Sequence, residues 1–149
     1  MTKFVTKPVR AIKGKQRFEE LVILSDVRDI GRIGSDNLIG VWEQYENSLE
    51  TKYRSSFNQL MMLMDRVANL KSLPATKFRD VTPEGELIRE YEFKAGDLRS
   101  YAIKIPNGKL ILLGGYKNQQ KEDFKRFRSL KKQYLDSLNL TVNEKGRLT

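Results

Sequence analysis

The chain has 149 residues, with 28 Lys and Arg against 19 Asp and Glu, and it contains neither cysteine nor histidine. The missing cysteine excludes disulfides, thiolate zinc sites and cysteine nucleophiles, and the missing histidine removes the usual general base. Any catalysis must therefore use carboxylate, lysine, arginine, tyrosine or hydroxyl groups. The length fits a single domain.

The formal net charge of +9 is unevenly placed along the sequence. Residues 99–149 carry twelve Lys and Arg against four Asp and Glu, whereas residues 36–98 carry eight against eleven. A field of positive sign attracts phosphates and acidic proteins. Nucleic acid or an acidic protein is therefore the expected partner.

The first 16 residues are basic and show no clear hydrophobic period. Together with Pro8 and Gly14, this pattern predicts a basic, solvated N-terminal extension. The segment lacks the apolar region of a secretory signal, and the longest apolar runs fall far short of the roughly 20 residues that span a bilayer. We expect a cytoplasmic protein with no membrane partner.

Two segments with different hydrophobic patterns follow the extension. Residues 17–24 form a short apolar segment that favours a strand. From Leu38 to Val67 the apolar residues recur at steps of three and four, which predicts helix. Asn47 with Glu50 can form a capping box, so we expect this stretch, within residues 36–71, to divide into a helical hairpin.

A meander of strands is predicted beyond Pro74. Residues 77–81, 87–93, 98–105 and 109–116 are rich in β-formers, and turn segments around Gly85, Gly96 and Gly108 separate them. The last three runs should be neighbours in a twisted, mainly antiparallel sheet. Residues 109–113 are nearly all apolar, so we expect a central strand that is covered on both faces.

The final predicted element is a helix over residues 119–137. Its apolar stripe consists of Phe124, Phe127, Leu130 or Lys131, Tyr134 and Leu138. A second stripe, rotated away from the first, is basic and consists of Lys121, Lys125, Arg128 and Lys132. Residues 139–149 have little to bury and predict a flexible tail, so the fold class is α+β.

The predicted order of strand, helical hairpin, antiparallel meander and basic helix resembles the RelE/ParE superfamily of bacterial toxins. The segments that carry the resemblance are KFRDV (77–81), LIREYEFKAGDLRSYAIKI (87–105) and KLILLGGYKNQQKEDFKRF (109–127), which are similar to HigB-like and RelE-like chains. The resemblance implies a toxin domain over residues 17–138 that a cognate antitoxin neutralises. Members of the superfamily bind the ribosome and cut mRNA, or in the ParE branch inhibit DNA gyrase.

The resemblance also implies site residues. Arg99 matches the arginine that holds the scissile phosphate, and Lys117 lies where the family carries an arginine or histidine for the leaving 5′-oxygen. Glu90 and Glu92 replace paired lysines, a departure from RelE itself, although some relatives use a glutamate base on this strand. Phe124 lies near the helix-borne aromatic of the family but lacks its hydroxyl.

RNA cleavage by such residues is chemically coherent without histidine. The reaction needs a base for the 2′-hydroxyl, cations for the phosphorane and an acid for the departing oxygen, which Glu90 or Glu92, Arg99 and Lys117 can supply. Arg99 and Lys117 are expected at strand ends or turns, where truncation costs little stability. Neither a metal nor a small-molecule cofactor is expected. The residues expected to bind RNA are Lys77, Arg79, Lys121, Phe124, Lys125, Arg128 and Lys132.

Three alternatives stay open. Glu90, Glu92 and the basic residues can simply form cross-strand ion pairs. The chain can be a non-enzymatic ParE-like gyrase inhibitor or a basic module that binds nucleic acid or protein through the terminal helix. It can also be an inactive, phage-derived relative.

Overall fold

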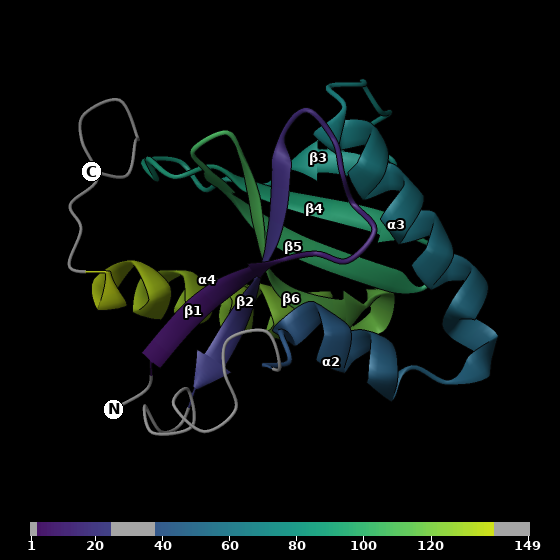
Figure 1. Ribbon diagram of the computed structural model, residues 1–149, viewed down its shortest axis with the longest axis horizontal. Helices are drawn as coiled ribbons and strands as arrows, with labels where there is room; N and C mark the ends of the chain where they lie inside the picture. Colours follow the sequence, from purple (N-terminus) through teal and green to yellow (C-terminus); the bar gives the residue numbers. More distant parts are fainter. Residues whose placement is uncertain (1–2, 25–37, 139–149) are drawn as a thin grey trace.

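A computed structural model describes residues 3–24 and 38–138, which build one six-stranded sheet with helices on both faces (Figure 1). The order of the strands across the sheet is β1-β2-β6-β5-β4-β3. The strands are β1 (Lys3–Pro8), β2 (Arg17–Leu24), β3 (Phe78–Asp80), β4 (Glu90–Ala95), β5 (Leu98–Ile105) and β6 (Gly108–Tyr116). The helices are α2 (Val41–Ser48), α3 (Arg54–Ala68) and α4 (Gln120–Ser137), with short 3-10 turns at Thr51–Tyr53 and Lys117–Gln119.

The α+β class and the meander are confirmed. Strands β4, β5 and β6 are consecutive antiparallel neighbours, and the predicted strands at residues 17–24 and 98–105 have the observed bounds. The sheet is mixed, however, because β2 runs parallel to β6. This parallel pairing follows from the crossover through α2 and α3 that connects β2 to the meander. The predicted tail at residues 139–149 lies outside the described residues.

The predicted N-terminal extension is wrong for residues 3–12. Residues Lys3–Pro8 pair antiparallel with the part of β2 from Glu19 to Leu24, and Val9 and Ile12 are buried in the core. The segment has no readable period because it forms an edge strand, whose exposed positions are Lys3, Thr6 and the terminal Pro8. Such residues are common at sheet edges, where they prevent pairing with other chains.

Helices α2 and α3 cover one face of the sheet. Helix α2 lies against β6 and β2, while α3 lies mainly against β4 and β5, so the two consecutive helices do not pair along their lengths as the predicted hairpin would (Figure 1). They meet through the Trp42 ring, which stacks on Phe57 at 5.1 Å between centroids. The break follows Ser48 as expected, but no side chain caps α3.

The start of α2 is fixed by a side chain from the sheet. Glu20 Oε1 on β2 accepts hydrogen bonds from the backbone N–H groups of Trp42 and Glu43, both at 3.1 Å. Burial raises the pKa of the Glu20 carboxyl, and the two N–H groups and nearby Lys7 oppose that rise. Two N–H groups that the helix leaves without a partner at its first turn are thereby satisfied.

Helix α4 covers the opposite face. The buried residues of α4 are Phe127, Lys131 and Tyr134. The sequence had left open whether Leu130 or Lys131 belongs to the buried stripe, and the structure shows that it is Lys131. A register shift of β6 against β5 at Tyr101 and Ala102 helps to keep Leu110, Leu112 and Leu113 in the core beneath α4. Ile111 belongs to the other core, so β6 is covered on both faces, as predicted.

Candidate functional site

Polar side chains gather on the sheet face that lies beneath α4. Because side chains alternate along a strand, Glu90, Glu92 and Lys94 of β4 share this face. The register sets Glu92 opposite Tyr101 and Lys94 opposite Arg99 on β5, with Arg79 of β3 beside Glu92. Three adjacent strands therefore bring carboxylates, cations and a phenol onto one surface.

The Glu92 carboxylate is at the centre of this surface. Its side chain has no exposure, yet Arg79 Nε donates to Oε1 at 2.8 Å from a guanidinium that is 43% exposed. Gln120 Nε2, from the first turn of α4, donates to Oε2 at 2.7 Å, and Lys94 Nζ lies 3.9 Å from Oε1. Glu92 thus links the sheet to α4, while the cations that it holds extend toward solvent.

Arg99 and Tyr101 lie side by side on β5. Arg99 is only 6% exposed, and its Nη1 donates to the carbonyl oxygens of Gly96 and Leu98, both at 2.8 Å. Arg99 is therefore not the exposed strand-end residue that the sequence suggested. The register places Arg99 opposite Gly115 of β6, and the Asp123 carboxylate of α4 occupies the space beside that glycine.

Tyr101 is fully buried and packs edge-on against Phe124 of α4, with 5.0 Å between ring centroids. Burial, together with the negative charges of Glu92 and Asp123, raises the pKa of the Tyr101 hydroxyl well above its ordinary value. The phenol is therefore protonated at neutral pH and can act as a hydrogen-bond donor.

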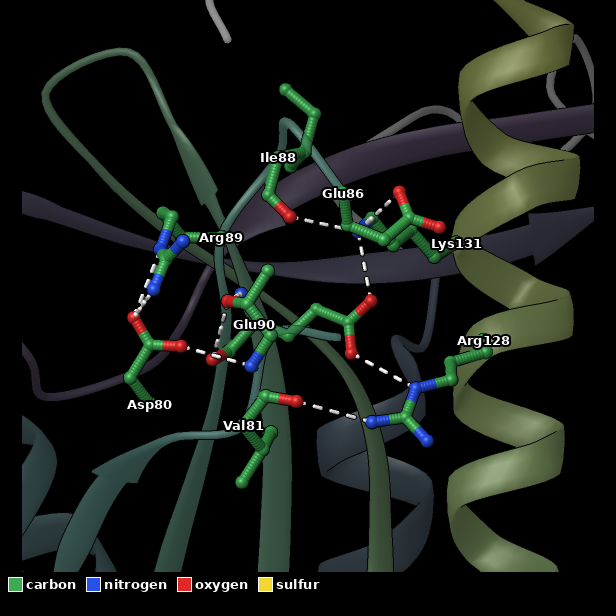
Figure 2. Close-up of polar contacts among 9 residues, drawn as sticks. Asp80, Val81, Glu86, Ile88, Arg89, Glu90, Arg128 and Lys131 are labelled. Atoms are coloured by element: carbon green, nitrogen blue, oxygen red, sulfur yellow. Dashed lines mark hydrogen bonds and ion pairs between the residues drawn. The ribbon is translucent and has the colours of Figure 1, made fainter. Parts of the chain in front are cut away.

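Glu90 belongs to a separate, buried cluster (Figure 2). Arg128 Nε donates to Oε1 at 3.1 Å and Lys131 Nζ donates to Oε2 at 2.8 Å, while the carboxylate itself is 1% exposed. The same two cations bind backbone carbonyls of the sheet side, Arg128 at Val81 and Lys131 at Ile88. This arrangement holds α4 to the sheet and leaves neither Glu90 oxygen without a donor.

The remaining predicted cations are spread over the surface. Lys117 is exposed beyond the end of β6, where its backbone N–H donates to Asp97 O at 2.8 Å and so places it beside the turn that precedes Arg99. Lys121 and Lys125 are exposed on the first turns of α4, and Lys77 is exposed before β3. Lys132 lies twelve residues beyond Gln120, or about 18 Å along the helix.

The structure therefore brings three predicted residues, Glu92, Arg79 and Arg99, onto one face, and a fourth, Phe124, packs on Tyr101 of that face. Lys117 follows β6, with its backbone beside the turn that precedes Arg99. Arg128 was expected in an outward basic stripe, but its Nε donates to the buried Glu90 carboxylate while its side chain stays 40% exposed. Glu90 lies in the other cluster.

Sequence reasoning missed the residues that complete the two clusters: Lys94, Tyr101, Gln120 and Lys131. Alternation along residues 98–105 could have revealed Tyr101, because it lies two positions after Arg99 and therefore on the same face. Gln120 and Lys131 depend on how α4 lies across the sheet, which local periodicity does not specify.

No protein-family model matches the chain, and neither a curated protein nor a solved structure is significantly similar to it. Among the described residues, no helix has the length and apolar character needed to cross a membrane. Within the same ranges, no three Asp or Glu side chains are grouped as a metal-binding set.

We expect Lys131→Met to lower the free energy of unfolding by about 3–5 kcal/mol, because it leaves the buried Glu90 carboxylate with one cation fewer. Urea denaturation would measure the change. Lys132→Met is the matched control, since that side chain is 79% exposed and should change stability by less than about 0.5 kcal/mol. Equal effects of the two substitutions would contradict a structural role for the Glu90 cluster.

Proposed function

We propose that this chain is the toxin of a bacterial toxin–antitoxin pair, of the RelE/ParE type, and that it cleaves ribosome-bound mRNA without a metal. The observation that carries the proposal is the face beneath the first turn of α4. There a buried carboxylate, Glu92, lies among the cations Arg79 and Lys94 and beside Arg99 and Tyr101 on the next strand. The order of β2, α2, α3, the meander and α4 supports the same resemblance.

Cleavage of RNA by its own 2′-hydroxyl needs three groups, and this face offers one for each task. Glu92 takes the proton of the 2′-hydroxyl, Arg99 neutralises charge on the phosphorane, and Lys117 stabilises or protonates the leaving 5′-oxygen. The reaction breaks the P–O5′ bond while the 2′-oxygen forms a new bond to phosphorus. No histidine is required in this scheme.

In the structure described, both oxygens of Glu92 accept hydrogen bonds, so the carboxylate must be released before it acts as a base. Binding of the RNA substrate provides this release. A phosphate group competes with Glu92 for the half-exposed Arg79 guanidinium, because phosphate binds the same planar fork of donors. Once Arg79 turns to the RNA, Glu92 Oε1 loses this hydrogen bond and is free to accept the proton of the 2′-hydroxyl.

The proposed partners follow from the same charges. The mRNA phosphates meet the cations around Glu92 and the exposed lysines at the start of α4, Lys121 and Lys125. A cognate antitoxin, acidic where it covers this face, would neutralise the toxin in the bacterial cytoplasm. No small-molecule cofactor takes part in the proposed reaction.

A second function, binding without catalysis, is favoured by one specific observation. Glu90 and Glu92 are both buried, and each of their oxygens already accepts a hydrogen bond from a cation or an amide. On this alternative the carboxylates only hold the helix and the strands together. The exposed lysines of α4 and Lys117 would then grip gyrase or nucleic acid.

We expect Lys117→Ala and Arg99→Lys to lower cleavage of ribosome-bound mRNA by about two to three orders of magnitude, which corresponds to losing one well-placed donor at the developing charge. Lysine at position 99 keeps the charge and a donor for the turn carbonyls but loses the planar fork. Primer extension on programmed ribosomes would measure the cleavage.

The control for these variants is Lys132→Ala, whose side chain is exposed near the other end of α4. Cleavage by this variant should stay close to that of the unaltered protein. If Lys132→Ala reduced cleavage as much as the other two substitutions, the cations would be acting as a diffuse phosphate-binding surface, and the second function would be preferred.

We also expect that inducing this protein alone in bacteria arrests growth, and that co-expression of its antitoxin, encoded by a small adjacent reading frame, restores growth. The reason is that an active toxin acts on translation until a tight complex covers it. Growth curves with the soluble protein quantified in each culture would measure the effect. Normal growth at high soluble expression would argue against the toxin assignment.

A further inference from the structure

A pocket between α2, α3 and the loop that follows β1 is lined by both apolar and acidic side chains. Its volume is about 290 Å³. The three apolar and three acidic side chains that matter here are Trp42, Phe57, Met61, Glu20, Glu43 and Glu46. A second pocket of about 300 Å³ adjoins the first, because Ala11 and Met61 line both. We call the two pockets together the α2–α3 groove.

Glu20 reaches the groove from strand β2. The residue is only 3% exposed, and its Oε1 accepts the backbone N–H groups at the start of α2. Its Oε2 accepts no hydrogen bond from a described residue, and Lys7, whose charge acts on Glu20, donates instead to the carbonyl of Leu38 at 2.9 Å. A buried carboxylate oxygen that lines a pocket and lacks a donor indicates a ligand that donates to it.

The groove is acidic, although the chain as a whole carries a net charge of +9. Its four carboxylates outnumber its two guanidinium groups, and these residues are Glu20, Glu43, Glu46, Asp65, Arg10 and Arg66. Arg10 pairs with Glu43 at 3.2 Å, but its side chain is 89% exposed and is readily displaced. Burial raises the pKa of the Glu20 carboxyl, so a cation bound beside it would favour its ionised form.

The acidic groups lie at both ends of the groove with an apolar residue between them. Asn58, Met61 and Asp65 recur at steps of three and four along α3 and therefore share one side of the helix. Asn58 and Asp65 are about 10 Å apart along the helix axis. Met61 separates the carboxylates of the first pocket from Asp65 in the second. This order matches a linear ligand in which methylene groups separate two ammonium groups.

We propose that the α2–α3 groove binds a linear aliphatic polyamine, of which spermidine is the test case. One terminal ammonium group donates to Glu20 Oε2 and takes the place of Arg10 at Glu43. The methylene groups lie along Met61, and the other terminal ammonium group reaches Asp65. Helices α2 and α3 cover the sheet face opposite α4, so this site is separate from the proposed cleavage face and does not depend on it (Figure 1).

Trp42 offers a direct measurement, because it is the only tryptophan of the chain and lines the groove. Its fluorescence is followed as spermidine is added to the whole chain at constant ionic strength, with sodium chloride as the balancing salt. The unaltered chain should show a saturable change. Glu20→Gln keeps an oxygen for the N–H groups of α2 but loses the charge, so it should need about tenfold more spermidine, as expected for one lost charge-assisted hydrogen bond. Glu19→Gln, on the same strand but outside the groove, is the matched control and should bind like the unaltered chain.

A second variant leaves the buried carboxylate untouched and therefore tests the site even if Glu20→Gln unfolds. Asn58→Lys places a competing ammonium group in the groove from an exposed position on α3, so spermidine affinity should fall by about tenfold or more. Gln59→Lys is the control, since it adds the same charge at the next exposed position of α3, which lines neither pocket of the groove.

Equal spermidine affinities in Asn58→Lys and Gln59→Lys would overturn the proposal. An unaltered chain whose fluorescence and melting temperature both ignore millimolar spermidine would overturn it as well. A third titration uses Nα-acetyl-lysine amide, which carries a single ammonium group and should bind more weakly than spermidine. If it bound as tightly, the groove would be a site for a lysine side chain of a protein and not for a polyamine.

Discussion

The attachment of α4 to the sheet through the buried Glu90 carboxylate is the interaction on which the rest of the site depends. Arg128 and Lys131 reach from consecutive turns of the helix to the two oxygens of one carboxylate, and each also binds a backbone carbonyl near β4. Buried ion pairs add little net stability but tolerate few geometries. The cluster therefore fixes where the first turn of α4 lies, with Gln120 and Phe124 above Glu92 and Tyr101.

Two glutamates of strand β4 thus have different roles, which the sequence alone could not distinguish. Glu90 and Glu92 occupy the same face of β4 two residues apart, and both are buried. Glu90 is held by Lys131, whose side chain is only 5% exposed, as well as by the 40% exposed Arg128. Glu92 has no enclosed cation, because Arg79 is 43% exposed and can be drawn away by a competing anion. The first carboxylate is suited to structure and the second to chemistry, which is why the proposed mechanism uses only Glu92.

The sequence predicted elements whose signal is local and missed those that depend on distant partners. Alternation and turn residues specified β5 and the order of the meander, and a helical period specified α4 within a residue of its observed start. Strand β1 was missed because its evidence is its pairing with β2, not its own pattern. Arg128 was assigned to an outward basic stripe because periodicity gives the angle around a helix but not the neighbour that a long side chain reaches, here Glu90.

In the proposed function, the face beneath the first turn of α4 binds RNA phosphate and the Glu90 cluster only supports it. The most direct measurement follows the side-chain Nε–H signals of the arginines by NMR in the nitrogen-15-labelled protein as a short single-stranded RNA is added. The signals of Arg79 and Arg99 should shift together, and that of Arg128, held by Glu90 and Val81, should not move. A shift of Arg128 with Arg79 and Arg99 unchanged would contradict the account.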